Sequence, residues 1–581
     1  MEYRKLAPSL AAAYQRYRQD DVPSLRRQSA ALGWVSVDEP AKPTRAVVSL
    51  VCTPGATLDD LKHEGLRINR GGDRIRTAIV PFDGLETLAE HDGVERIVPA
   101  HLLRPYLDVA RTSVGVDTFQ NDTGLTGKNV LVGVVDTGID PHHPAFAGRI
   151  ERIWDQTLHG PGVPEGAFGL ELKGAHLTQS RDTEGHGSHV SGIFAGAESV
   201  YRGVAPDARI VVVKTNFLDA GITAGIQYVF RVGREMGLPT VVNLSLGGHY
   251  DPHDGSDAMS RSVDEETGPG RLVCCAAGNE GTDDIHARVP VDGTAVKSLP
   301  CIPDVKGRRH DFMLNGWYAT GSRFEVAVVA PSGHSTAFQG PIPTTENPAR
   351  TYDLPDGKVE IATPETNTLN ADRNFFVMVG PAASSQTPGL LPTWQLLVRG
   401  AGAADRGTAD VWILDSSGHA RFNGPLTSDD MKIGSPGCAA SAITVAAYAT
   451  KTSWEDIDHD RFSAPWLRLD DIADFSSEGP LRHGARKPDV TAPGAMIASA
   501  LSQDSAPDRQ LTLDTEHVAM QGTSMASPFL AGVCALLLER DNGLEPARVK
   551  EMLKDHSARP HGQAGEFDEK WGYGLIDVAG L

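Results

Sequence analysis

Apolar and polar positions follow three different patterns along this chain of 581 residues. In two regions, nearly continuous apolar runs of strand length alternate with helical stretches, as expected for a parallel sheet that is covered on both faces. The strand-like runs cover residues 129–135, 209–213, 240–246, 272–277 and 442–447, and the helical stretches cover 186–197, 224–235 and 529–538. This pattern predicts an α/β fold built on a doubly wound parallel sheet.

The second pattern fills residues 286–431, where short alternating strands follow one another with Pro, Gly, Asn and Asp between them and without a long helix. It predicts an antiparallel β-sandwich inserted into the α/β sheet. The third pattern lies near the N-terminus and indicates a small α+β unit. Its strand candidates are 46–52, 76–81 and 94–98, and its short helix candidates are 57–65 and 84–91.

The predicted domain order follows from these patterns. Residues 1–45 are polar and form an N-terminal extension with one helix candidate at 8–20, and residues 46–110 form the α+β domain. Residues 111–285 and 432–581 form the two parts of the α/β domain, on either side of the inserted sandwich at 286–431.

Composition narrows the classes of function and the expected surroundings. The net charge of −21 argues against nucleic acid or an anionic membrane as the main partner. No apolar run reaches the ~18 residues of a membrane-spanning helix, and no signal-peptide core develops near the start. The six cysteines have irregular spacing without a zinc pattern, so we expect buried thiols in a reducing compartment. A cytoplasmic protein is therefore expected, and a secreted one would need a leader beyond this sequence.

Two motifs place an acid and a base beside glycines. Asp136 ends a buried strand and is followed by Thr137 and Gly138, at the edge where open α/β sheets collect catalytic groups. His186 stands between two glycines at the start of an apolar helix, where the helix dipole favours the neutral imidazole that a general base requires. Taken alone, Asp136 would equally be a turn cap, and a single histidine is more often a cap or a core residue. His186 and His189 lack a third ligand of suitable spacing, so no metal is predicted.

Two further motifs supply a hydroxyl and an amide. Ser524 begins a helix that is apolar on nearly all faces, with Pro528 tolerated in the first turn. Its hydroxyl suits a nucleophile, and its own unpaired backbone N–H suits an oxyanion donor. Asn279 follows a buried strand in a Gly-Asn pair and offers uncharged N–H donors. Singly, the serine would be a helix cap and the asparagine part of a turn.

In combination, these four motifs in the order Asp, His, Asn, Ser resemble the subtilase family of serine peptidases. Five further stretches resemble the family: 203–206 (Gly-Val-Ala-Pro), 245–247 (Ser-Leu-Gly), 475–480 (Phe-Ser-Ser-Glu-Gly-Pro), 487–494 (Lys-Pro-Asp-Val-Thr-Ala-Pro-Gly) and 572–577 (Gly-Tyr-Gly-Leu-Ile-Asp). The resemblance spans about 121–285 and 433–581. It implies a subtilisin-like fold and a serine endopeptidase that works through an acyl-enzyme.

The resemblance also implies a role for each residue. Asp136 would hold the tautomer of His186, and His186 would take the proton of Ser524 and return it to the leaving amine. Asn279 and the Ser524 amide would form the oxyanion hole. The substrate-binding residues implied are Ser245, Leu246, Gly247, Ala276, Ala277 and Gly278. Smooth walls of this kind predict sizeable apolar or aromatic P1 residues, with Glu280 tolerating a basic one.

The α+β domain resembles a subtilase propeptide, which implies an intramolecular inhibitor and chaperone joined to the enzyme between Pro99 and Asp117. An ordinary accessory domain is the alternative. Protein or peptide substrates are the other expected partners, without nucleic acid or membrane. No cofactor is expected for the chemistry. Many secreted subtilases have an acidic calcium ligand where this chain has Pro144-Ala145-Phe146, so structural calcium has no support here.

Three hypotheses of function are therefore carried forward. The first is an active endopeptidase. The second is a binding protein or scaffold on the same fold, which the presence of all three triad residues disfavours. The third is a latent enzyme that stays blocked until its N-terminal domain is cleaved.

Overall fold

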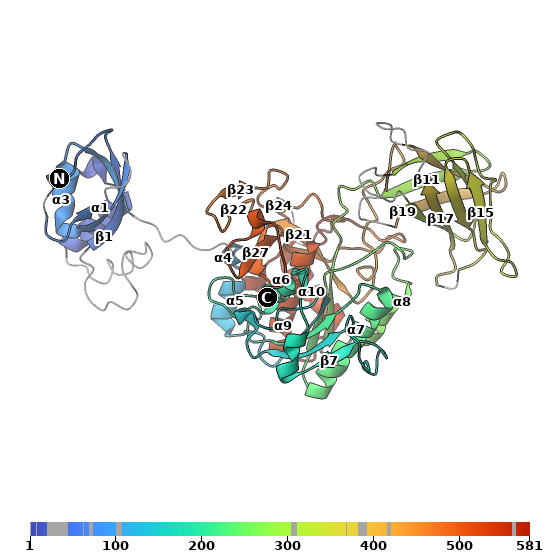
Figure 1. Cartoon of the computed structure of the whole chain (residues 1–581), viewed down its shortest axis with the longest axis horizontal. Helices are drawn as coiled ribbons and strands as arrows, with labels where there is room; N and C mark the ends of the chain where they lie inside the picture. Colours follow the sequence, from blue (N-terminus) through green and yellow to red (C-terminus); the bar gives the residue numbers. More distant parts are fainter. Residues whose placement is uncertain are drawn as a thin grey trace. The chain divides into compact units, whose positions relative to one another are not determined.

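The computed structural model of the chain describes residues 2–6, 8–19, 45–61, 63–68, 74–99, 107–303, 311–367, 369–381, 392–414, 420–560 and 565–581. The chain forms two compact units, Met1–Pro105 and Tyr106–Leu581. Figure 1 colours them along the sequence from blue to red. Each unit is described by itself below.

The first unit is built on a four-stranded antiparallel sheet in the order β2-β3-β1-β4. Its elements are η1 (Tyr3–Lys5), α1 (Pro8–Arg18), β1 (Arg45–Cys52), β2 (Arg67–Ile68), β3 (Ile75–Pro81), η2 (Phe82–Gly84), α3 (Leu85–Glu90) and β4 (Val94–Pro99). Leu10 and Tyr14 of α1 lie in the same hydrophobic core as Val48 and Leu50 of β1. The helix of the predicted extension therefore contributes to the core of the α+β domain.

The short helix predicted at 57–65 is wrong. The described residues there follow successive tight turns, in which Leu61 N donates to Leu58 O at 3.3 Å and Leu66 N donates to His63 O at 3.1 Å. Gly65 adopts a left-handed backbone with a φ of 83°, which ends any helical path.

The second unit contains a mixed sheet in the order β28-β29-β25-β21-β10-β9-β5-β8-β6-β7. Its strands are β5 (Leu131–Asp136), β6 (Ile150–Asp155), β7 (Leu170–Leu172), β8 (Arg209–Lys214), β9 (Thr240–Leu244), β10 (Arg271–Ala276), β21 (Ile443–Ala449), β24 (Asp471–Ile472), β25 (Val490–Pro493), β28 (Ser557–Ala558) and β29 (Leu575–Ile576). The strands from β6 to β29 in this order pair in parallel, whereas β7, β28 and β24 pair antiparallel.

Helices cover this sheet on both faces. They are α4 (Leu107–Ser113), α5 (Val116–Thr123), α6 (His186–Ala195), α7 (Asp219–Met236), α8 (Ala258–Glu266), α9 (Thr523–Arg540) and α10 (Pro546–Asp555). Alternate residues of β10 enter different cores, because Cys274 packs with α6 and α9 while Cys275 packs with α7. All six cysteines are free and buried, as predicted. Figure 1 shows α6 and α9 running through the centre of this unit.

Residues 286–422 form two antiparallel sheets, in the orders β11-β19-β13-β17-β16-β15 and β14-β18-β12-β20 (Figure 1). Their strands are β11 (His286–Asp292), β12 (Lys297–Pro303), β13 (Phe312–Tyr318), β14 (Phe324–Val329), β15 (Ala349–Leu354), β16 (Gly357–Ala362), β17 (Arg373–Pro381), β18 (Trp394–Gly400), β19 (Arg406–Ile413) and β20 (Ala420–Phe422). Both sheets contribute to one hydrophobic core. We call this region the β-rich insertion.

The β-rich insertion is joined to the α/β part through a stack of buried rings, which we call the seam stack. His249 and His253 follow β9, and their rings are parallel with centroids 5.2 Å apart. His253 stacks on Trp412 of β19 at 3.9 Å, and His286 of β11 stacks on Trp412 at 4.5 Å. Asn315 Nδ2 adds a hydrogen bond of 3.1 Å to the carbonyl oxygen of His249. The insertion is thus packed against the residues that follow β9.

Two short hairpins complete the unit, β22 (Ser453–Glu455) with β23 (Arg461–Ser463) and β26 (Ile497–Ala500) with β27 (His517–Met520). The chain passes from β27 directly into α9. Among the helices of the described ranges, none has the length and apolar character needed to cross a membrane.

Candidate active site

Asp136 and His186 meet where β5 ends and α6 begins. The Nδ1 atom of His186 lies 2.7 Å from Oδ1 of Asp136. The carboxylate is fully buried, and its Oδ1 also accepts the backbone N–H of Thr137 at 2.7 Å. Its Oδ2 is buried without a hydrogen-bond partner among the described residues. The pair therefore has the acid–imidazole geometry that the sequence predicts.

The charge around His186 acts against the neutral form that the helix dipole was expected to favour. Burial disfavours the charged imidazole, but the charge of Asp136 and its hydrogen bond outweigh burial, and the pKa of His186 is raised. Asp182 and Glu184 act in the same direction. The carboxylates near this helix N-terminus thus favour the protonated imidazole, opposite in direction to the effect expected of the dipole.

Asp182 is a positioning residue that motif analysis did not single out. Its carboxylate accepts the backbone N–H groups of Gly185 at 2.9 Å and Ser188 at 2.8 Å, which caps the start of α6. It also accepts the Thr137 hydroxyl at 2.8 Å, and that hydroxyl in turn accepts the N–H of Gly187 at 2.8 Å. This network fixes the helix that carries His186 to the loop that follows Asp136.

Ser524 stands in the first turn of α9, as predicted. Its Oγ donates to the carbonyl oxygen of Ser245 at 3.3 Å, and its own carbonyl accepts the Ser245 hydroxyl at 2.7 Å. Within the described part of the chain, Ser524 and His186 share no hydrogen bond. The imidazole and the carboxylate are therefore brought into contact, whereas the hydroxyl is held against the end of β9.

Asn279 lies beside the start of α9. Its Oδ1 accepts the backbone N–H of Thr523 at 2.9 Å and the Thr523 hydroxyl at 3.1 Å, which leaves the Nδ2 donors for another acceptor. A Cβ placed on Gly522, whose φ is 153°, would lie 3.4 Å from Nδ2 of Asn279 and 3.5 Å from N of Ser524. The two predicted oxyanion donors thus lie on either side of Gly522, whose backbone angle favours glycine.

A pocket of about 180 Å³ opens beside these donors. The predicted substrate-binding residues all line it, together with Asn279 and Ser524: Ser245, Leu246, Gly247, Ala276, Ala277 and Gly278. Segments after β9, after β10 and at the start of α9 therefore converge on one cavity. This convergence follows from the parallel sheet, in which neighbouring strands end at the same edge.

Three ionisable side chains also line this pocket, namely Glu280, Lys432 and His249. Only Glu280 was expected there; it accepts the Asn279 N–H at 2.8 Å and the Ser477 hydroxyl at 3.0 Å. Lys432 is fully buried and donates to Asp429 Oδ1 at 2.9 Å. His249 belongs to the seam stack, and burial lowers its pKa. No motif in the sequence singles out the last two as pocket residues.

Two groups of side chains in the described part of the chain have ligand atoms close enough for a metal ion. Asp254, Asp372 and His483 form one, but Arg482 already lies 3.2 Å from Asp254 and 2.6 Å from Asp372. The other is His143, Glu198 and His517. His189 belongs to neither, since its Nε2 is hydrogen-bonded to the Ile497 carbonyl oxygen at 2.9 Å and burial lowers its pKa to about 3.

The fold and this constellation define a peptidase of the subtilisin-like class, and comparisons with known proteins agree. The subtilase family pattern matches residues 127–304 and 382–574, well over half of the chain. The chain therefore belongs to the subtilase family of serine proteases.

Individual relatives are distant. The serine protease AprX of Bacillus subtilis is 24% identical over 486 residues, which cover 81% of this chain and 70% of AprX. The PI-type proteinase of Lactococcus lactis is 24% identical, and the match covers 87% of this chain but only 28% of that protein. The solved structure of the CspB protease of Clostridium perfringens, at 23% identity, superposes with a TM-score of 0.66 and covers 81% of this chain and 95% of that one. This last likeness shows the fold alone.

Proposed function

We propose that the chain is a serine endopeptidase in which Asp136, His186 and Ser524 form the catalytic triad. The observation that carries the proposal is the 2.7 Å contact between His186 and a buried carboxylate. Ser524 and Asn279 support it, because both line one pocket. A buried carboxylate in contact with His186 stabilises the imidazolium that forms when His186 accepts a proton.

In the proposed reaction, a substrate carbonyl enters the space between Asn279 Nδ2 and the Ser524 amide. Ser524 Oγ gives up its contact with the Ser245 carbonyl, transfers its proton to His186 and attacks the carbonyl carbon. The resulting oxyanion receives the two N–H donors, and His186 then protonates the leaving amine. Water then takes the place of the amine. His186 removes a proton from the water, which attacks the acyl carbon, and His186 returns the proton to Ser524 Oγ as it leaves. Hydroxyl–imidazole contacts of this kind are often loose in the absence of substrate.

The Ser524→Ala variant tests this proposal. We expect purified full-length protein to cleave casein, and the variant to lose activity by roughly 10⁶-fold, the scale established for the subtilisin serine. A Ser524→Ala protein that cleaves casein at the wild-type rate would show that this triad is not the catalyst. Wild-type protein that binds casein without cleaving it would favour the scaffold hypothesis.

We further propose that the first unit is a propeptide that the enzyme removes. The predicted junction at 99–117 narrows to 99–107, because α4 and α5 are built into the second unit. Arg111 is buried and hydrogen-bonded to the carbonyl oxygen of Gly203, and Val578 N donates to Val114 O at 2.8 Å. Most of the narrowed junction, residues 100–106, lies outside the described residues.

Intact mass measurement and N-terminal sequencing test this maturation. Wild-type protein should yield a fragment that begins between residues 100 and 107, and Ser524→Ala protein should remain whole. Cleavage of both proteins at the same bond would assign the cut to another protease. Wild-type protein that stays whole and fully active would identify the first unit as an accessory domain.

A further inference from the structure

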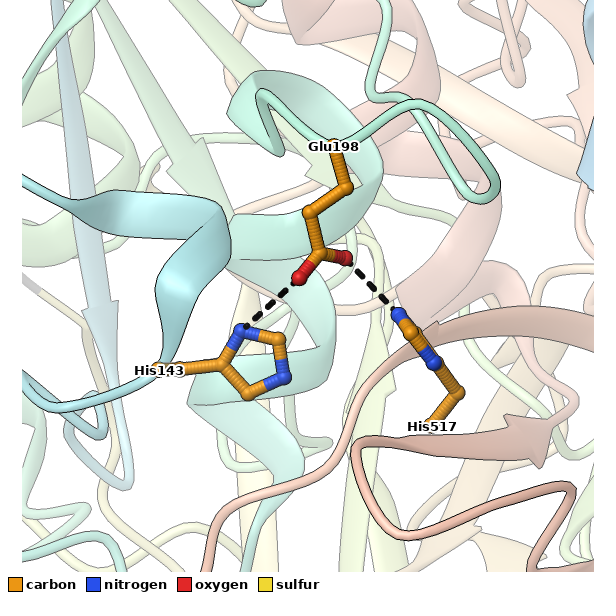
Figure 2. A group of neighbouring side chains, drawn as sticks. All are labelled: His143, Glu198 and His517. Carbon is orange, nitrogen blue, oxygen red and sulfur yellow. Dashed lines mark hydrogen bonds and ion pairs between the residues drawn. The ribbon is translucent and has the colours of Figure 1, made fainter.

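The group formed by His143, Glu198 and His517 has no part in the proposed chemistry. Figure 2 shows the three side chains pointing toward one another from separate segments, with one oxygen of Glu198 facing each imidazole. Oε1 lies 3.7 Å from His143 Nδ1, and Oε2 lies 2.7 Å from His517 Nε2. The three side chains are 3%, 15% and 7% exposed, in that order. The carboxyl group of Glu198 is thus held between two nearly buried rings.

Hydrogen bonds fix the protonation of His143. Its Nε2 lies 2.8 Å from the carbonyl oxygen of Glu516, which only accepts, so Nε2 carries the proton. Its Nδ1 accepts the N–H of Ala145 at 3.2 Å and is therefore unprotonated. The Nδ1 atom, whose lone pair accepts the Ala145 N–H, and Oε1 of Glu198 are thus two acceptors 3.7 Å apart without a proton between them. Two such neighbouring acceptors can both bind one cation.

The second imidazole is oriented in the same way. Nδ1 of His517 lies 2.8 Å from Oδ1 of Asp514, so it donates outward to a carboxylate and leaves Nε2 pointing at Glu198. Metal-binding histidines characteristically donate their other ring N–H to a carboxylate or a backbone carbonyl. His517 donates to the carboxylate of Asp514, and His143 donates to the backbone carbonyl of Glu516.

We propose that His143, Glu198 and His517 bind one zinc ion, through Nδ1, a carboxylate oxygen and Nε2. The three ligand atoms lie within 4.8 Å of one another. Tetrahedral zinc with bonds of about 2.0–2.1 Å separates its ligand atoms by about 3.3 Å. The observed separations, each to a different oxygen of Glu198, are 3.7 and 2.7 Å. The metal replaces the proton between His517 Nε2 and Glu198, and this proton is released. His143 Nδ1 binds the metal in place of the Ala145 N–H, and water is the fourth ligand. Calcium fits poorly, because it requires six to eight oxygen ligands.

The positions of the ligands in the chain indicate what the ion does. His143 lies in the loop that follows Asp136, Glu198 follows the helix that His186 begins, and His517 begins the strand that leads to Ser524. One ion would therefore tie together the three segments that carry the proposed triad. Its role is structural, and its binding does not depend on the proposed peptidase activity.

Metal binding is tested on full-length Ser524→Ala protein, which avoids self-digestion. Bound metal is first removed with a chelator, zinc is added back, and unbound zinc is removed by gel filtration. We expect one zinc ion per chain and a Tm about 3 °C or more above that of the metal-free protein. Cobalt(II) should give the visible absorption of a tetrahedral site, and calcium should leave Tm unchanged. In the same background, Glu198→Gln and His143→Gln should lose the cobalt absorption and the zinc-dependent gain in Tm. His142→Gln changes the exposed neighbouring histidine and should keep both.

Several results would overturn the inference. Absence of bound zinc and cobalt, or equal binding by the His142, His143 and Glu198 variants, would place the metal elsewhere or nowhere. A gain in Tm with calcium but not with zinc would mean that a different ion and site are involved. If Glu198→Gln lowers Tm while zinc never changes it, the group is an ion pair only. Circular dichroism of each variant confirms that a lost signal is not lost folding.

Discussion

Two groups of three residues draw on the same three segments of the chain, yet their surroundings differ. In the first group, Asp136 and His186 are in contact and Ser524 lines a pocket, whereas His143, Glu198 and His517 form a nearly buried cluster. The first group leaves a hydroxyl and amide donors available to a substrate. In the second, the outer ring nitrogens are already occupied. The same three segments can thus carry a reactive site and a structural site. The two sites differ in which polar atoms remain without a hydrogen-bond partner.

After the loss expected for Ser524→Ala, the largest expected effect comes from replacing the carboxylate of the first group. Asp136→Asn keeps the size of the side chain but removes the charge that stabilises the imidazolium and fixes its tautomer. We expect kcat to fall by about 10⁴-fold with little change in Tm. Steady-state kinetics with a fluorogenic peptide measures this, and a loss below tenfold would separate Asp136 from catalysis.

The next effect concerns the oxyanion donors. Asn279→Ala removes the Nδ2 donors and should lower kcat by about 10²–10³-fold with KM nearly unchanged, the range established for the corresponding donor of subtilisin. The same assay gives both constants. A rise in KM at constant kcat would instead assign Asn279 to substrate binding.

A smaller effect, tenfold per pH unit, follows from His186. Because its pKa is raised above 6.5 and a general base must be neutral, kcat/KM should fall tenfold for each unit below that pKa. Glu184→Gln removes one of the charges that raise the pKa, so the acidic limb should move to lower pH by a fraction of a unit. A profile that is flat between pH 5 and 8 would contradict the assignment of His186 as base.

The smallest effect on catalysis is expected from the matched change in the second group. Glu198→Gln is the same carboxylate-to-amide replacement as Asp136→Asn, but Glu198 touches no reacting atom. At 25 °C, kcat/KM should fall by less than about tenfold, while the dependence of Tm on zinc disappears. A loss of activity as large as that of Asp136→Asn would merge the two groups into one functional site.

The contrast between the groups also explains what could be predicted from the sequence. Asp136, His186, Asn279 and Ser524 lie in short motifs at the ends of apolar strands and helices, so pattern and motif agree on their positions. The α/β sheet is equally readable, because buried parallel strands are continuous apolar runs.

Other residues needed the folded structure. His143, Glu198 and His517 are isolated polar residues at unrelated spacings, and only the convergence of their segments brings them together. Lys432 and His249 lie on opposite sides of the β-rich insertion in the chain, and only the fold brings both to the pocket. The sequence pattern places helix α1 in a separate extension, because most of the surrounding residues are polar. Only a few apolar residues, such as Leu10 and Tyr14, enter the core of the first unit.

The seam stack gives the β-rich insertion a direct bearing on protein engineering. Trp412 belongs to the insertion and closes over His253, whose neighbour His249 lines the pocket. An enzyme shortened by deleting the insertion would leave that histidine pair with one face open to water and the pocket without its backing. A minimal version of this protease would therefore need new side chains to cover His253, as well as a shorter chain.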